Sequence, residues 1–202
     1  MSKLNAIVAQ RRLDVAEAKT LVSAEELRAR IAVAKPPGDF VAVLGSNGPM
    51  ALLAEMKRAS PSKGDIAKGV DAAQQGLGYA LAGACTISVL TEPHGFKGSL
   101  DDLVRVRGAL EAAGLSPGVC VLRKDFIVDE YQLLEARAHG ADSALLIVAS
   151  LPMEELQALM AFARGLGMEP LVEVDIYIYV RRYIYIYIYI YIYIYIYIRI
   201  QI

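Results

Sequence analysis

The chain has 202 residues and a formal net charge of −1. This length permits one domain with a sizeable core. The near-neutral charge gives no electrostatic case for binding nucleic acid or an anionic membrane. The two cysteines, Cys85 and Cys120, each lie in an apolar run and are expected to be buried free thiols. Their spacing predicts neither a zinc site nor a redox pair, and their low number is typical of a reducing compartment.

The N-terminal residues carry no secretory signal, because they lack an apolar segment followed by a small-residue cleavage site. Acidic residues at Asp14 and Glu17 argue against an organellar transit peptide. We therefore expect a cytoplasmic protein, with an organellar location as the alternative.

Residues 3–34 are predicted to be helical. Leu4, Ile7, Val8 and Val15 recur near one face of a 3.6-residue period. The segment Ser23-Ala-Glu-Glu26 has the form of a capping box and predicts the start of a second helix. Proline and glycine at 35–38 predict its end.

From residue 50 onward, short apolar runs alternate with helical stretches. The predicted strands are 52–56, 86–90, 119–122, 144–148 and 170–174, and the predicted helices are 70–82, 99–113, 129–138 and 152–166. This alternation predicts parallel βαβ units, and the strands are apolar enough to be covered on both faces.

The distribution of polar residues favours a barrel over an open sheet. They lie at or just after the C-terminal ends of several strands, where barrel enzymes build their active sites. These residues are Glu55, Lys57, Thr91, Glu92, Lys124, Asp125 and Glu173. A closed barrel needs eight strands and about 250 residues. With about five of eight strands, the predicted fold class is α/β, an incomplete (β/α)8 TIM barrel with an N-terminal helical extension.

The segment from Ala54 to Asp65 is the most informative. Glu55 and Lys57 point the same way because the side-chain period of a strand is two. The loop after them contains Ser60, Gly64 and further polar residues, which suit an approaching anion. Taken alone, this pattern also fits a solvated turn with an ion pair.

Further segments with charged, polar or aromatic residues follow along the chain in a characteristic order. They are Ser88-Val-Leu-Thr-Glu92, Phe96-Lys-Gly98, Leu122-Arg-Lys-Asp-Phe126, Asp129-Glu-Tyr-Gln132, Gly140-Ala-Asp142, Leu145-Leu-Ile147 and Gly167-Met-Glu-Pro-Leu-Val-Glu-Val174. In this order and spacing, residues 4–174 resemble the indole-3-glycerol-phosphate synthase family. The resemblance implies that the N-terminal helices lie over the mouth of the active site.

The resemblance also implies a reaction. The substrate is 1-(2-carboxyphenylamino)-1-deoxyribulose 5-phosphate, a sugar phosphate carrying anthranilate. A lyase of this family closes the indole ring with loss of carbon dioxide and water, a step of tryptophan biosynthesis. It uses neither a metal nor an organic cofactor, and in some lineages it is fused to other tryptophan-pathway domains.

Roles for seven residues follow from the resemblance. Ring closure requires an acid that protonates the ketose carbonyl, and Lys124 matches that position. Glu173 and Lys57 match the acid and base of dehydration, and Glu55 matches a carboxylate that holds the lysines and the substrate. The substrate-binding matches are Ser60 in the first loop and the apolar walls Phe96 and Phe126.

Other polar residues are expected to be structural. His94 is predicted to be a surface loop residue, and His139 to lie at a helix C-terminus. The segment Gly140-Ala-Asp142 is placed on the opposite, stabilising face of the barrel. Arg11 and Arg12 are predicted to be solvated helix charges.

After Val174 the resemblance is expected to end. The family would continue with an asparagine-bearing sixth strand and glycine-containing phosphate turns, whereas this chain continues into Tyr-Ile repeats from Tyr183 to Ile198. A (TA)n DNA repeat encodes Tyr-Ile in every frame. We therefore interpret the tail as non-native, arising from an unspliced intron, a misassembled sequence or a degenerate gene.

The predicted organisation has three parts: a helical extension at 1–49, a partial barrel at 50–174 and a low-complexity tail at 175–202. Three readings of function stay open. The first is a synthase. The second is an inactive, truncated or pseudogene product. The third is an interaction protein whose tail forms β structure with other chains.

Overall fold

The computed structural model describes residues 3–46, 50–67 and 69–174; the predicted tail at 175–202 lies outside them. Within this part of the chain, five parallel strands form one sheet in the order β1-β4-β5-β6-β7. The strands are β1 (Leu53–Met56), β4 (Thr86–Leu90), β5 (Cys120–Lys124), β6 (Ser143–Ile147) and β7 (Leu171–Glu173). Consecutive strands of the sheet are neighbours, as in a barrel wall.

The helices follow the predicted alternation. They are α1 (Lys3–Leu21), α2 (Ala24–Val33), α3 (Phe40–Ser46), α4 (Ala72–Leu81), α5 (Leu100–Ala112), α6 (Glu130–Ala138) and α7 (Met153–Gly165), with a 3-10 turn at Val148–Ser150. The prediction of an incomplete (β/α)8 barrel with five strands is confirmed for the described residues. The main boundary error concerns β5, which begins and ends later than the expected 119–122 and so includes Lys124.

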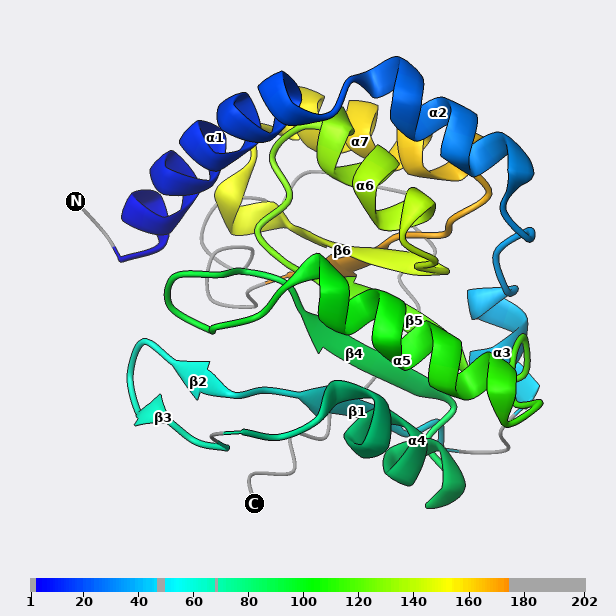
Figure 1. Cartoon of the computed structure of the whole chain (residues 1–202). Helices are drawn as coiled ribbons and strands as arrows, with labels where there is room; N and C mark the ends of the chain where they lie inside the picture. Colours follow the sequence, from blue (N-terminus) through cyan, green and yellow to red (C-terminus); the bar gives the residue numbers. More distant parts are fainter. Residues whose placement is uncertain (1–2, 47–49, 68, 175–202) are drawn as a thin grey trace, which may run out of the picture.

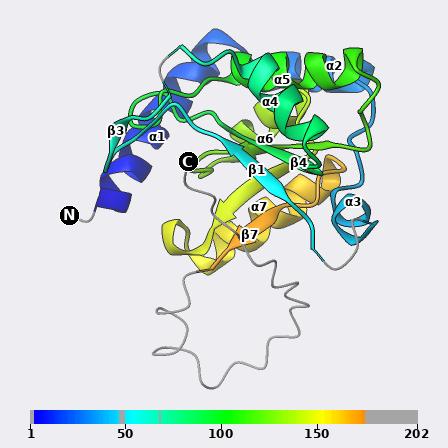
Figure 2. The ribbon, with the colours of Figure 1, turned by 90° about the horizontal axis from the view of Figure 1, so that it is seen from below.

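Helices α4 to α7 cover one face of this sheet (Figures 1 and 2). Ile87 and Val89 of β4 are fully buried on this face. They share a core with Leu103, Val106 and Leu110 of α5. Burying such side chains is worth about 1.5–3 kcal/mol each, which fixes the helical layer against the strands.

The N-terminal helices lie at two different ends of the sheet. Helix α1 lies near the C-terminal ends of the strands, together with the hairpin β2–β3, and α3 lies at the opposite end (Figure 1). Helix α2 packs against α6, where Leu27 and Leu134 are buried in a shared cluster. Ser23 accepts a hydrogen bond from the Glu26 N–H, which is one of the two hydrogen bonds of the predicted capping box.

Helix α3, the hairpin β2–β3 and the 3-10 turn were not predicted. Helix α3 buries only Phe40 and Leu44, which is too few for a visible period. The two-residue strands β2 (Ala59–Ser60) and β3 (Gly64–Asp65) pair within the loop after β1. The sequence signals there were those of a loop, because the hairpin is formed by local hydrogen bonds around glycine at positive φ.

Asp142, His139 and the two cysteines have the structural roles expected of them. Asp142 accepts hydrogen bonds from the N–H groups of Gly38 and Val121 at the N-terminal end of the sheet. His139 is the C-cap of α6. Cys85 and Cys120 are buried free thiols, and burial beside Asp142 raises the pKa of Cys120 to about 12.

Candidate active site

A cavity of about 330 Å³ lies at the C-terminal ends of the strands. Six of the seven residues predicted for the site line it, and Ser60 does not. The lining residues are Glu55, Lys57, Leu90, Phe96, Lys124, Asp125, Phe126, Leu145, Ile147 and Glu173. Strand register explains the convergence, because parallel neighbours end at the same edge of the sheet.

Two ion pairs bring both charge signs into this cavity. The Lys57 Nζ lies 2.8 Å from the Glu55 Oε1, within one strand end. The Lys124 Nζ lies 3.2 Å from the Glu173 Oε2, which joins β5 to β7. The side chains of Glu55, Lys57 and Lys124 are largely buried, whereas that of Glu173 is 51% exposed. Groups in such surroundings can divide acid and base roles.

Two aromatic rings form a wall of the cavity. The centroids of Phe96 and Phe126 are 6.0 Å apart, with planes tilted by 42°. The Lys57 Nζ lies 5.7 Å from the centroid of the Phe96 ring, within the range of a cation–π contact. The wall is therefore suited to a flat aromatic group placed near a cation.

Ser60 lies in the hairpin and is buried. Its Oγ accepts a hydrogen bond from the Lys63 N–H at 3.2 Å, which shapes the turn between β2 and β3. Contact between Ser60 and a substrate remains a prediction.

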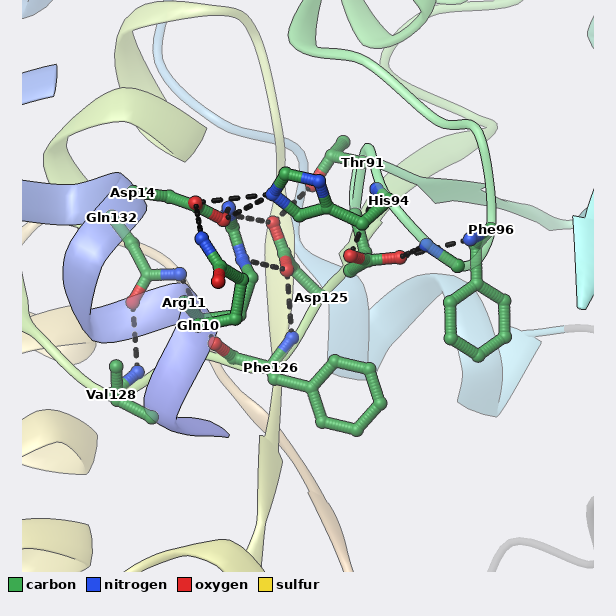
Figure 3. Close-up of polar contacts among 12 residues, drawn as sticks. Gln10, Arg11, Asp14, Thr91, His94, Phe96, Asp125, Phe126, Val128 and Gln132 are labelled. Atoms are coloured by element: carbon green, nitrogen blue, oxygen red, sulfur yellow. Dashed lines mark hydrogen bonds and ion pairs between the residues drawn. The ribbon is translucent and has the colours of Figure 1, made fainter. Parts of the chain in front are cut away.

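The expectation for Arg11 was wrong. It is 6% exposed, and it donates two hydrogen bonds to Asp125, from Nε at 3.0 Å and from Nη2 at 2.9 Å (Figure 3). A third bond reaches Asp14 at 2.7 Å. The partner is 114 residues away in sequence, so the local helical pattern could not show it. Arg12 forms an exposed pair with Glu155 and matches the expectation.

Asp125 is the centre of a buried polar network at the end of β5. Its carboxylate also accepts from the Arg123 guanidinium at 3.0 Å and the Thr91 hydroxyl at 2.7 Å. Burial opposes its charge, but the two arginines and Thr91 outweigh burial and hold the pKa of Asp125 below its usual range. The Phe126 N–H donates to the Asp125 Oδ1 at 2.8 Å. The network therefore holds the segment that carries Lys124 and Phe126.

The loop after β4 folds around another buried carboxylate. Glu92 is 3% exposed and accepts hydrogen bonds from three successive backbone N–H groups, those of His94, Gly95 and Phe96. The sequence placed Glu92 at the rim but gave no sign of this role. His94 is exposed as expected, and its Nε2 lies 3.1 Å from Asp14 of α1 (Figure 3).

Two negative findings concern the described residues. Among residues 3–46, 50–67 and 69–174, no group of three His, Cys, Asp or Glu side chains could hold a metal ion. None of the helices described is both long and apolar enough to cross a membrane.

Comparison with known proteins decides the family. The family model described as Indole-3-glycerol phosphate synthase matches residues 4–182. The chain belongs to the indole-3-glycerol phosphate synthase family. The match passes Val174, where we expected the resemblance to end, and stops where the uninterrupted Tyr-Ile repeat begins at Tyr183.

Individual relatives agree with this family. The chain is 46% identical over 171 residues to the Indole-3-glycerol phosphate synthase of Roseiflexus castenholzii, covering 85% of this chain and 63% of the relative. It is 48% identical over 174 residues to Indole-3-glycerol phosphate synthase 1 of Streptomyces coelicolor, covering 86% and 62%. It is 52% identical over 178 residues to the Multifunctional tryptophan biosynthesis protein of Schizosaccharomyces pombe, covering 86% and 23%. The chain thus spans less than two thirds of these synthases.

Proposed function

We propose that the cavity binds 1-(2-carboxyphenylamino)-1-deoxyribulose 5-phosphate and that its residues are those of indole ring closure. One observation carries the proposal: two lysine–carboxylate pairs and two phenylalanines line one cavity. The aromatic wall suits the anthranilate half of this substrate. The charged pairs suit the sugar half, where protons must be given and taken.

The proposed chemistry starts at Lys124. Its ammonium group protonates the ketose carbonyl oxygen, and the aromatic carbon that carries the carboxylate attacks the carbonyl carbon. Carbon dioxide then leaves and restores the aromatic ring. Loss of the new hydroxyl as water needs a second acid and a base, and we assign this acid–base pair to Glu173 and Lys57 together. Glu55 holds Lys57 at 2.8 Å and orients it.

The sequence lacks the main phosphate-binding turns that the resemblance implies for the end of the barrel. Residues 175–202 contain none of the glycine turns that the family uses to hold phosphate. Binding energy from such remote groups is used at the reacting centre, so its loss lowers turnover as well as affinity. We expect no measurable formation of indole-3-glycerol phosphate by the 202-residue chain; an absorbance assay at high protein concentration checks this, and clear turnover would contradict it.

A hybrid protein tests the proposed roles directly. Residues 1–174 would be joined to the segment that follows the equivalent position in the Roseiflexus castenholzii relative. We expect this hybrid to form indole-3-glycerol phosphate and Lys124→Met to abolish the reaction. Lys35→Met is the matched control, because Lys35 is 77% exposed and pairs with Glu111 on an outer helix. An inactive, folded hybrid would contradict the proposal.

We also propose the domain context, the cellular location and the domain division of this chain. Multifunctional relatives support a place beside other tryptophan-pathway domains. The location that we propose is cytoplasmic, with an organellar location as the alternative. The division into 1–49, 50–174 and 175–202 remains our proposal, with the last part a product of a (TA)n repeat. Sequencing the transcript across the codons for Val174 and Asp175 tests it, since a message that continues into the family's sixth strand supports the synthase reading.

A further inference from the structure

We propose that Glu92 is a positioning residue that sets the ring of Phe96 for the aromatic half of the substrate. This inference rests on the proposed function and deepens it, because it names the residue on which recognition of the anthranilate ring depends. Glu92 does not line the cavity itself. It acts through the backbone of the loop that carries Phe96.

The Glu92 carboxylate is surrounded by backbone N–H groups of one loop. The Glu92 Oε1 accepts from the His94 N–H at 3.0 Å, and Oε2 accepts from the Gly95 and Phe96 N–H groups at 2.7 and 2.9 Å. The Gly98 N–H donates to the Glu92 carbonyl at 2.9 Å and closes the loop. Successive N–H groups that surround one anion form a compact nest, which fixes the backbone of all the donors.

The loop that carries Phe96 is crowded at two of its glycines. A Cβ at Gly98 would lie 2.1 Å from the Leu90 carbonyl oxygen, and a Cβ at Gly95 would lie 2.8 Å from the Pro61 Cγ. Lys97 has a φ of 55°, which costs a non-glycine residue free energy. The charge-assisted bonds to Glu92 offset this unfavourable backbone. Without them, the tight loop has much less to stabilise it.

The loop reaches the cavity through the side chain of Phe96. Phe96 is one of the three residues whose N–H groups bind the carboxylate, so the origin of its side chain is fixed by Glu92. From there the ring lies 6.0 Å from Phe126 and 5.7 Å from the Lys57 Nζ. In Figure 3 the rings of Phe96 and Phe126 both lie to the lower right of the hydrogen-bonded network. Displacing the loop would therefore open the aromatic wall.

The chemistry of the acceptor makes Glu92→Gln a sharp test. The amide has the shape of the carboxylate, but its nitrogen carries two hydrogens and cannot accept from an N–H group. At least one N–H group of the nest would then face another donor. Glu155→Gln is the matched control, because Glu155 is an exposed residue of α7 that pairs with Arg12 outside the cavity.

A single indole reports on the position of the ring. The chain contains no tryptophan, so Phe96→Trp in the full chain introduces one fluorophore at the wall. We expect Glu92→Gln in this background to shift the emission to longer wavelength as the indole moves into water, with unchanged far-ultraviolet circular dichroism. Glu155→Gln should leave the emission unchanged. A purely structural role, felt only as lower stability, would not move the emission of the folded chain.

Binding of anthranilate, without the tryptophan, tests the functional claim. We expect Glu92→Gln to weaken anthranilate binding roughly tenfold, as loss of a charge-assisted bond would. Glu155→Gln should bind as the parent chain does. Equal anthranilate affinity in Glu92→Gln and the parent overturns the inference. If the parent chain does not bind anthranilate, the proposed aromatic site is wrong. In that case the fluorescence experiment alone decides the role of Glu92. A shift of the emission supports positioning of residue 96 by Glu92, and the absence of a shift overturns it.

Discussion

Arg11 shows how a buried charge can be hidden in an ordinary helical pattern. Its immediate neighbours in the sequence, Gln10 and Arg12, are polar, and only the fold brings Asp125 within 2.9 Å of it. Burial lowers the pKa of Arg11, but the attraction of Asp125 and the hydrogen bonds with Asp14 and Asp125 outweigh it, so the pKa stays above its ordinary value. The guanidinium therefore joins α1 to the end of β5, next to Lys124.

Replacing Arg11 should cost far more than replacing Arg12. Removing one partner of a buried ion pair normally leaves the other charge without compensation. Here Arg123 still compensates Asp125, so we expect Arg11→Met to lower the free energy of unfolding by a smaller amount, about 2 kcal/mol. Arg12→Met removes an exposed pair and should change stability by less than about 0.5 kcal/mol. Urea unfolding of a chain ending at Val174 measures both. Equal effects of the two substitutions would mean that the Arg11 pair does not anchor α1.

The lowered pKa of Asp125 predicts that the folded chain loses stability in acid. Its folded pKa lies below the ordinary carboxyl value of about 3.9, so its stabilisation is fully present above about pH 4. It is lost as the pH falls through the lower, folded value. We expect the unfolding free energy to drop steeply below about pH 4. Asp125→Asn should be less stable at neutral pH and should show a shallower drop; identical pH profiles would contradict this.

Among the helices, α5 and α6 each begin at a side-chain cap that is visible in the sequence. Ser99 accepts from the Asp102 N–H and Asp129 from the Tyr131 N–H, so the starts of α5 and α6 were placed within one residue. The nest around Glu92 was not predictable, because its hydrogen bonds come from the backbone and leave no mark on composition. The same reason explains the missed hairpin after β1.

Two glycines of α4 should respond in opposite ways to alanine. A Cβ at Gly76 would lie 2.9 Å from the Val106 Cγ1 of α5, whereas a Cβ at Gly78 would meet nothing within 4 Å. Alanine gains about 1 kcal/mol of helix propensity at either site. Overpacking at Gly76 costs about 1–3 kcal/mol and should more than cancel that gain. Thermal unfolding should therefore show Gly76→Ala less stable and Gly78→Ala more stable than the parent; stabilisation by both would mean that α4 and α5 are less closely packed.

In the whole molecule, the parallel pairing of the strands followed from the alternation of strands and helices, but their sequential order did not. The position of the polar residues at strand ends correctly favoured a barrel wall over an open sheet, since Glu55, Lys124 and Glu173 line one cavity. The arrangement of α1 over this end could not be derived from periodicity. It depends on contacts such as His94 with Asp14, between segments 80 residues apart.

The incomplete barrel and the tail together predict aggregation of the full chain. Within the described residues, β1 and β7 end the sheet with one neighbouring strand each. Such edges present unpaired N–H and C=O groups to other chains. The repeat from Tyr183 to Ile198 has high β propensity and contains no charge, proline or glycine, which is the composition of cross-β segments.

We therefore expect the full chain to form β-rich aggregates that a chain ending at Val174 does not form. Only Arg181, Arg182 and Arg199 flank the repeat as charges that oppose assembly. A two-residue repeat also fixes no register, because a slip of two residues leaves every contact unchanged and many pairings become equivalent. Light scattering and thioflavin fluorescence of the two chains at equal concentration provide the measurement. A full chain that stays monomeric, with a shortened chain that is no more soluble, would show that the repeat does not drive assembly.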